Sequence, residues 1–187
     1  MREAEVLLAS ASPRRLYYLE RAYLRVEVLP VSIDESRREG ETAIQLASRL
    51  AIEKAAPFAS STIPVVAGDT VVSFQGRILG KPESPEGAQE MLTALSGNEH
   101  EVVSGWCVRH GEVVRHGIET SRVRFRALNR RQIDRYVETG EPLDKAGAYG
   151  IQGLGGELVE SVRGSWSSVV GMPLVPVLSA LRDFLVR

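Results

Sequence analysis

A chain of 187 residues is long enough for one domain with a sizeable core, and 43% hydrophobic and 25% charged residues are ordinary for a globular protein. Its 23 basic and 24 acidic residues lack the excess of positive charge typical of nucleic-acid-binding domains, so no stable nucleic-acid partner is expected. The single cysteine, Cys107, excludes an intrachain disulfide framework and a cysteine-based zinc site.

No targeting or membrane-spanning segment is indicated. Only four apolar residues, Val6 to Ala9, stand together near the N-terminus, which is too short for the core of a signal peptide. No stretch approaches the roughly 18 apolar residues that cross a bilayer. We therefore expect a cytoplasmic protein with no membrane contact.

In the first half of the chain, strands and helices alternate. A buried strand over residues 6–9 leads into Ser12 and Pro13, which suit the N-cap and the first position of a helix. A second strand is predicted over residues 25–30, with Val28 among its buried residues. A capping box at Thr42 then begins a long helix that ends near Pro57.

The second half continues the alternation. It is predicted to contain a buried strand over 64–74, a helix over 84–97, an antiparallel pair over 100–109 and 113–125, a helix capped by Asn129, a strand over 157–162 and a terminal helix from Pro173. The pattern predicts a single α/β domain, 1–187, in which helices flank both sides of a mixed sheet and a central cleft separates two lobes.

The first candidate for chemistry is the turn from Ser10 to Arg15. Two hydroxyls and two guanidiniums, with the free N–H groups of a helix N-terminus, form an anion site. From the turn alone, an ordinary N-cap with solvated arginines is the simpler interpretation.

The second candidate is Asp69, which lies within the apolar strand. An unpaired buried carboxylate is costly, so such a group usually faces a cation, a metal or water. The preceding Gly68 would let a ligand or another backbone come close. A strand-end aspartate that only stabilises a turn is the alternative.

Two of the three lysines are further candidates. Lys54 falls near the end of the long helix, where a solvated cation matched to the helix dipole is the simpler interpretation. Lys81, between Gly80 and Pro82, lies in a less ordinary position. Either side chain could reach a polyphosphate.

A glycine-dense segment over 144–156 is the fourth candidate. Its glycines allow a flat ligand to approach the backbone, and Gln152 offers donors and an acceptor suited to the edge of a base. The spacings of the Rossmann and P-loop motifs are absent. A purely structural glycine loop is the alternative.

Taken together, these segments resemble the Maf family of nucleoside triphosphate pyrophosphatases, also called septum formation proteins. The matching motifs, in chain order, are Leu8-Ala-Ser-Ala-Ser-Pro-Arg-Arg15, Arg49-Leu-Ala-Ile-Glu-Lys-Ala55, Gly68-Asp-Thr-Val-Val72, Leu79-Gly-Lys-Pro82, Leu95-Ser-Gly97 with His100, Asp144-Lys-Ala-Gly-Ala-Tyr-Gly-Ile-Gln-Gly153 and Val169-Val-Gly-Met-Pro-Leu174. The segment 144–153 is similar to the subgroup that acts on dTTP and UTP. The resemblance implies a Maf/ITPase-like fold and hydrolysis to a nucleoside monophosphate and pyrophosphate.

The resemblance also implies a role for each candidate. Asp69 would accept the proton of the attacking water and contact a divalent ion, Mg²⁺ or a similar cation, with Glu35 as the second metal ligand. The residues expected to bind substrate, by holding the triphosphate or by selecting the nucleotide, are Ser10, Arg14, Lys54, Thr70, Lys81 and Gln152.

Two other functions stay open at the level of sequence. The chain could hydrolyse modified or methylated nucleotides, or act as a non-catalytic regulator of septum formation that binds a partner protein. The expected ligand is a small nucleotide, and the sequence leaves a homodimer open.

Overall fold

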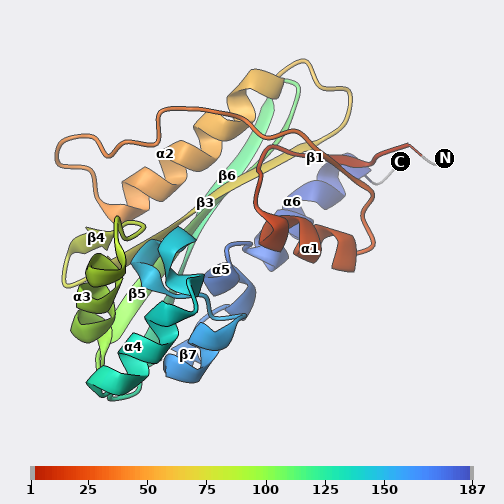
Figure 1. Cartoon of the computed structure of the whole chain (residues 1–187). Helices are drawn as coiled ribbons and strands as arrows, with labels where there is room; N and C mark the ends of the chain where they lie inside the picture. The colour runs from red at the N-terminus through yellow and green to blue at the C-terminus, as the bar shows by residue number, and fades with distance from the viewer. Residues whose placement is uncertain (1–2, 186–187) are drawn as a thin grey trace. The chain divides into compact units, whose positions relative to one another are not determined.

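The computed structural model describes residues 3–185 and has the predicted α/β architecture (Figure 1). Within those residues a mixed sheet of seven strands has the order β2-β1-β3-β5-β6-β7, with β4 paired to β3. The strands are β1 (Val6–Leu8), β2 (Val26–Val28), β3 (Val65–Phe74), β4 (Arg77–Leu79), β5 (Glu99–His110), β6 (Val113–Phe125) and β7 (Val159–Arg163). The α-helices are α1 (Pro13–Arg21), α2 (Ala43–Ala55), α3 (Pro85–Leu95), α4 (Arg130–Glu138), α5 (Trp166–Val170) and α6 (Leu174–Leu185).

The chain forms two compact units. Unit 1 consists of Met1–Asp69, Ser104–Glu119 and Gly171–Arg187, and unit 2 of Thr70–Val103 and Thr120–Val170. The long strands β3, β5 and β6 each contribute residues to both units. No helix in residues 3–185 combines the length and the apolar character that crossing a membrane requires.

The core of unit 1 has two layers because successive residues of a strand point to opposite faces of the sheet. The layer that packs with α1 and α6 is formed by Val6, Leu8, Leu19, Val66, Val108, Met172, Val177, Ala180 and Leu181. The layer that packs with α2 is formed by Leu7, Ala9, Ala51, Ala55, Val65, Ala67 and Cys107. Helices therefore cover both faces of the sheet in this unit, as predicted.

Small residues let α2 approach the sheet closely. A Cβ at Gly105 of β5 would overlap the backbone of Ala47 in α2. The helix begins with the predicted capping box, in which the Thr42 side chain accepts from the Gln45 N–H and the Gln45 side chain accepts from the Thr42 N–H. The sequence therefore specifies both where α2 begins and how near to the sheet it lies.

The prediction that Val28 is buried is wrong, because Val28 is 37% exposed. It belongs to β2, a strand of three residues at one end of the strand order, where β1 is its only neighbour among the strands of residues 3–185. An end strand has fewer elements to cover it than a central strand.

In unit 2, α3 and α4 pack against each other (Figure 1). Asn129 and Gln132 form the predicted capping box of α4. The turn between β3 and β4 places Gln75 and Gly76 at positive φ, which glycine tolerates readily. Unit 2 also contains an aromatic cluster in which the rings of His100, Phe125 and Tyr149 meet edge to face.

The predicted strand over 157–162 begins later than expected. A 3₁₀ helix, η4 (Leu154–Leu158), occupies its first positions, and β7 starts at Val159. The helix α5, which the sequence analysis did not predict, contains only five residues and so lacks a clear helical period.

Candidate active site

Two carboxylates and one ammonium meet in unit 1. The Lys54 Nζ lies 2.8 Å from Asp69 Oδ1 and 2.7 Å from Glu35 Oε1. The side chains of Lys54 and Asp69 are 8% and 13% exposed, whereas that of Glu35 is 57% exposed. The cluster is therefore buried on one side and open on the other, as expected for a site that receives a charged ligand.

The interpretation of Lys54 as a solvated cation is wrong. The buried residues of α2 are Leu46, Ala47, Leu50, Ala51, Lys54 and Ala55. They recur at spacings of three and four, so Lys54 lies on the apolar face of the helix. The position of Lys54 on that face was therefore the signal in the sequence that could have predicted its burial. Ion pairing with Asp69 and Glu35 stabilises the buried charge.

The loop that carries Glu35 is held to α2 by a second ionic cluster. Arg49 binds Glu41 through two hydrogen bonds, Nε to Oε1 at 2.7 Å and Nη2 to Oε2 at 2.9 Å, and also binds Glu53 at 3.0 Å. Hydrogen bonding to Arg49 lowers the pKa of Glu41 to about 2, so the pair stays ionised. Arg49 also donates to the Ser36 carbonyl, next to Glu35, at 3.0 Å.

Asp34 has a local role in this loop. Its Oδ1 accepts hydrogen bonds from the Ser36 N–H at 2.9 Å and from the Ser36 hydroxyl at 2.6 Å. These hydrogen bonds from Ser36 form an Asx-type turn, lower the pKa of Asp34 and occupy one oxygen of its carboxylate. Glu35, in contrast, pairs with Lys54, so Glu35 is the acidic residue of this loop that joins the cluster.

The turn after β1 places a buried arginine beside Asp69. Strands β1 and β3 are parallel with Leu8 opposite Val66, so β1 ends two residues before the level of Gly68 and the turn follows. Arg15 donates from Nη1 to Ser10 Oγ at 2.9 Å and from Nε to the Gly171 carbonyl at 3.0 Å. Burial lowers the pKa of Arg15, while the nearby Asp69 carboxylate opposes that shift, and a guanidinium remains a cation throughout.

Gly68 makes room for this arrangement. A Cβ at Gly68 would lie 3.0 Å from the Gly105 carbonyl oxygen and 3.5 Å from Arg15 Nε. The predicted close approach of another backbone at Gly68 is therefore confirmed, and the neighbour on its other side is a cation.

Arg15 was predicted only as one of the two guanidiniums of the turn, and solvation was the simpler interpretation; that interpretation is wrong, because Arg15 is buried. Arg15 and Leu19 are the buried residues of α1, one helical turn apart. That spacing could have identified Arg15. Ser12 and Pro13 occupy the predicted N-cap and first-turn positions, but the Ser12 side chain makes no capping hydrogen bond. Arg14 follows in the same first turn, and its charge acts on Arg15.

The other predicted substrate contacts belong to unit 2. Thr70 follows Asp69 in β3, while Lys81 and Gln152 are exposed. The Gly80 carbonyl accepts a hydrogen bond of 3.0 Å from the Gly147 N–H, which joins the segment before Lys81 to the glycine-dense segment. The structure thus brings together the predicted residues of unit 1 and, separately, the two segments that carry Lys81 and Gln152.

The donor set in unit 1 is compatible with Mg²⁺. Among residues 3–185 no group of three or more His, Cys, Asp or Glu side chains could hold a metal ion. Glu35 and Asp69, however, direct carboxylate oxygens to one shared cation. One or two carboxylates, completed by water and substrate phosphate oxygens, are the usual ligands of Mg²⁺ at phosphate sites.

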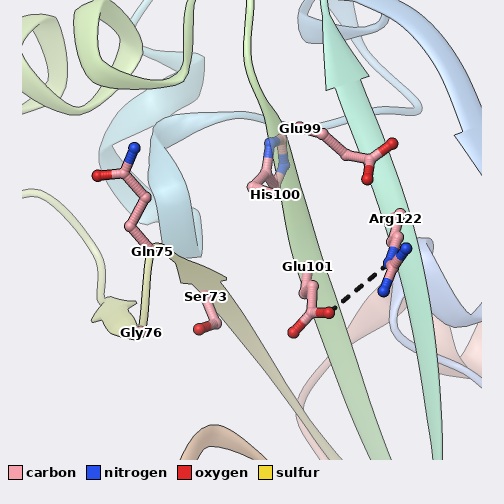
Figure 2. Close-up of a pocket in the computed structure, with 7 residues that line it drawn as sticks. All are labelled: Ser73, Gln75, Gly76, Glu99, His100, Glu101 and Arg122. Atoms are coloured by element: carbon pink, nitrogen blue, oxygen red, sulfur yellow. Dashed lines mark ion pairs between the residues drawn. The ribbon is translucent and has the colours of Figure 1, made fainter.

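Unit 2 also has a polar pocket of about 420 Å³ at the turn after β3 (Figure 2). It is lined by Ser73, Gln75, Gly76, Glu99, His100, Glu101 and Arg122. Glu99 and Glu101 lie on the side of β5 that faces β6, where Glu101 pairs with Arg122 at 3.7 Å, and Glu99 pairs with Arg163 at 3.9 Å. Both carboxylates of the pocket thus have an arginine partner, and none of the predicted site residues lines it.

Comparison with known proteins identifies the family of the chain. The model of the Maf-like protein family matches residues 5–184, and the chain belongs to that family. Curated relatives named dTTP/UTP pyrophosphatase include those of Pyrococcus furiosus, 41% identical over 95% of this chain and 94% of the relative, and Methylococcus capsulatus, 45% identical over 96% and 91%. A third relative of that name, from Anaeromyxobacter, is 46% identical over 95% and 88%.

A solved structure of a HAM1 protein from Coxiella burnetii is also similar. It has a TM-score of 0.41 and 21% identity over 65% of this chain and 73% of the other.

Proposed function

We propose that this chain is a Mg²⁺-dependent nucleoside triphosphate pyrophosphatase that hydrolyses dTTP and UTP to the monophosphate and pyrophosphate. The observation that carries the proposal is the convergence of Asp69 and Glu35 on the buried Lys54, next to the Ser10–Arg15 pair. Membership of a family whose curated relatives are dTTP/UTP pyrophosphatases supports the same activity.

Asp69 is the proposed proton acceptor. It takes a proton from a water molecule while the water oxygen forms a bond to a phosphorus atom of the α–β anhydride. The bridging P–O bond breaks, and the substrate leaves as a nucleoside monophosphate and pyrophosphate. Its contact with Lys54 supports this role by geometry, because the 2.8 Å ion pair fixes the position of the carboxylate in the site.

The cations of the site would bind the triphosphate and offset its charge. Phosphoryl transfer depends mainly on positioning and on electrostatic stabilisation of the phosphate oxygens. Ser10 and Lys54 provide a hydroxyl and a cation in unit 1, and Lys81 provides an exposed ammonium in unit 2. Arg15 would act indirectly, because its guanidinium holds the Ser10 hydroxyl in place.

Glu35 and Asp69 would hold the metal ion. Mg²⁺ bound there would neutralise the charge that develops on the phosphate oxygens. Both carboxylates now contact Lys54, so we expect that ammonium to turn toward the substrate phosphates when the site is occupied.

Selection among nucleotides is assigned to Arg14, Thr70 and Gln152. The exposed amide of Gln152 can both donate and accept hydrogen bonds, which suits the O4 and N3–H edge shared by thymine and uracil. Cytosine presents an amino group and an unprotonated nitrogen instead, so a fixed amide distinguishes the two patterns.

A panel of nucleoside triphosphates at equal concentration, with separation of all products, tests this proposal. We expect dTTP and UTP to be the best substrates, with equal amounts of monophosphate and pyrophosphate. Diphosphate and orthophosphate as products would contradict cleavage of the α–β anhydride. Preferential hydrolysis of a methylated or otherwise modified nucleotide would contradict the assignment of dTTP and UTP.

A further inference from the structure

The glycine-dense segment is fastened to the rest of unit 2 by two side chains. We call residues 147–156 the recognition loop, because they include Gln152. Tyr136, on the buried face of α4, accepts a hydrogen bond of 3.0 Å from the Gly150 N–H and donates one of 2.9 Å to Glu141 Oε1. Burial raises the pKa of Tyr136, so the hydroxyl keeps the proton that it donates to Glu141.

Glu141 binds the far side of the recognition loop. It lies at the start of the 3₁₀ helix η2 (Glu141–Asp144), and both of its carboxylate oxygens accept backbone N–H groups. Oε2 accepts from Leu154 at 3.0 Å, and Oε1 accepts from Gly155 at 3.1 Å. Hydrogen bonds to an ionised acceptor are stronger than those between neutral groups.

The glycines of the recognition loop fit around these two side chains. A Cβ at Gly153 would overlap the Glu141 carboxylate, and a Cβ at Gly155 would lie 2.5 Å from the Tyr136 hydroxyl. At Gly150 a Cβ would lie 3.1 Å from Glu141 Oε1. These three glycines therefore have a structural role, which the sequence analysis gave as the alternative to contact with a ligand.

We propose that Tyr136 and Glu141 are positioning residues that fix the recognition loop and thereby set selection of the base by Gln152. This inference rests on the proposed function of the chain. The anchored N–H groups of Gly150 and Leu154 bracket Gln152 by two residues on each side. Anchoring on both sides restricts the conformations of the exposed amide, and discrimination by hydrogen bonding requires such restriction.

The test compares Tyr136→Phe and Glu141→Gln with the wild type and with Glu138→Gln. Tyr136→Phe keeps the ring but removes the hydroxyl, and Glu141→Gln keeps the shape but offers one acceptor oxygen where the carboxylate offers two. Glu138, exposed near the end of α4, is the matched control. The measurements are kcat and KM for dTTP and dCTP, and the hydrogen exchange rates of the Gly150, Leu154 and Gly155 amides.

We expect the preference for dTTP over dCTP to fall by about tenfold in both variants, mainly through a higher KM for dTTP, because loss of one hydrogen bond corresponds to about one decade in binding. Exchange should accelerate at Gly150 in Tyr136→Phe and at Leu154 or Gly155 in Glu141→Gln. Glu138→Gln should match the wild type in every measurement.

Two failures can be told apart. If the variants are active and retain the wild-type KM and the wild-type preference for dTTP over dCTP, the inference is overturned but the proposed function is not. A lower thermal stability of the variants would not change this conclusion. A wild-type protein that releases no pyrophosphate from dTTP or UTP would contradict the proposed function and overturn the inference with it.

Discussion

The imidazole of His100 should make the stability of the chain depend on pH. His100 is 2% exposed, and its Nε2 lies 2.8 Å from the Tyr149 hydroxyl. Its Nδ1 has no hydrogen-bond partner among residues 3–185. Burial lowers the pKa of His100 from 6.5 to about 4, because a charged ring would be desolvated.

The sign follows from proton linkage. The unfolded chain binds a proton near pH 6.5, whereas the folded chain binds it only near pH 4, so acid favours the unfolded state. This stabilisation is fully present above pH 6.5 and is lost as the pH falls toward 4. Between about pH 7 and about pH 5 the loss amounts to about 2 kcal/mol, before most carboxylates begin to titrate.

Urea unfolding of the wild type and His100→Leu at both pH values measures this loss. The substitution also leaves the Tyr149 hydroxyl without its partner, but that cost is the same at both pH values and cancels from the difference. The exposed His116 provides the control, since His116→Leu removes no buried ring. Equal pH dependence of His100→Leu and the wild type would refute the reasoning.

Three further perturbations address the packing and the ionic cluster. Gly105→Ala should destabilise the chain by about 1–3 kcal/mol in urea unfolding, because the added Cβ overlaps the Ala47 backbone, whereas Gly80→Ala, with nothing within 4 Å, should not. Arg49→Met should lower kcat about tenfold in a pyrophosphate-release assay by freeing the loop of Glu35, and an unchanged kcat would contradict that role. Treatment with EDTA should abolish pyrophosphate release, and added Mg²⁺ should restore it.

Much of the fold could be predicted because local signals were strong. Capping boxes at Thr42 and Asn129 marked the starts of α2 and α4, and a run of apolar residues around Asp69 marked β3. The boundary of β7 could not be predicted, because the 3₁₀ helix before it leaves no clear period in the sequence. Burial at the end of the sheet, as at Val28, depends on tertiary neighbours that local sequence does not specify.

The candidate site was predicted through resemblance more than through composition. Position alone suggested that Lys54 is solvated, and only the face of α2 on which it lies reveals its contacts with Asp69 and Glu35. The burial of Arg15, which position alone also suggested to be solvated, likewise depends on the face of α1 on which it lies. The role of Glu141 in binding backbone N–H groups of the recognition loop depends on a contact between residues 13 or 14 positions apart, which no short motif encodes.

The central claim is that the Asp69 carboxylate accepts the proton of the attacking water. Asp69→Asn keeps the size of the side chain and removes its basicity, so pyrophosphate release from dTTP should fall by about 10³-fold. The matched variant Asp34→Asn, at the turn beside Glu35, should retain most of the activity. Pyrophosphate release by Asp69→Asn within about threefold of the wild-type rate would contradict the account.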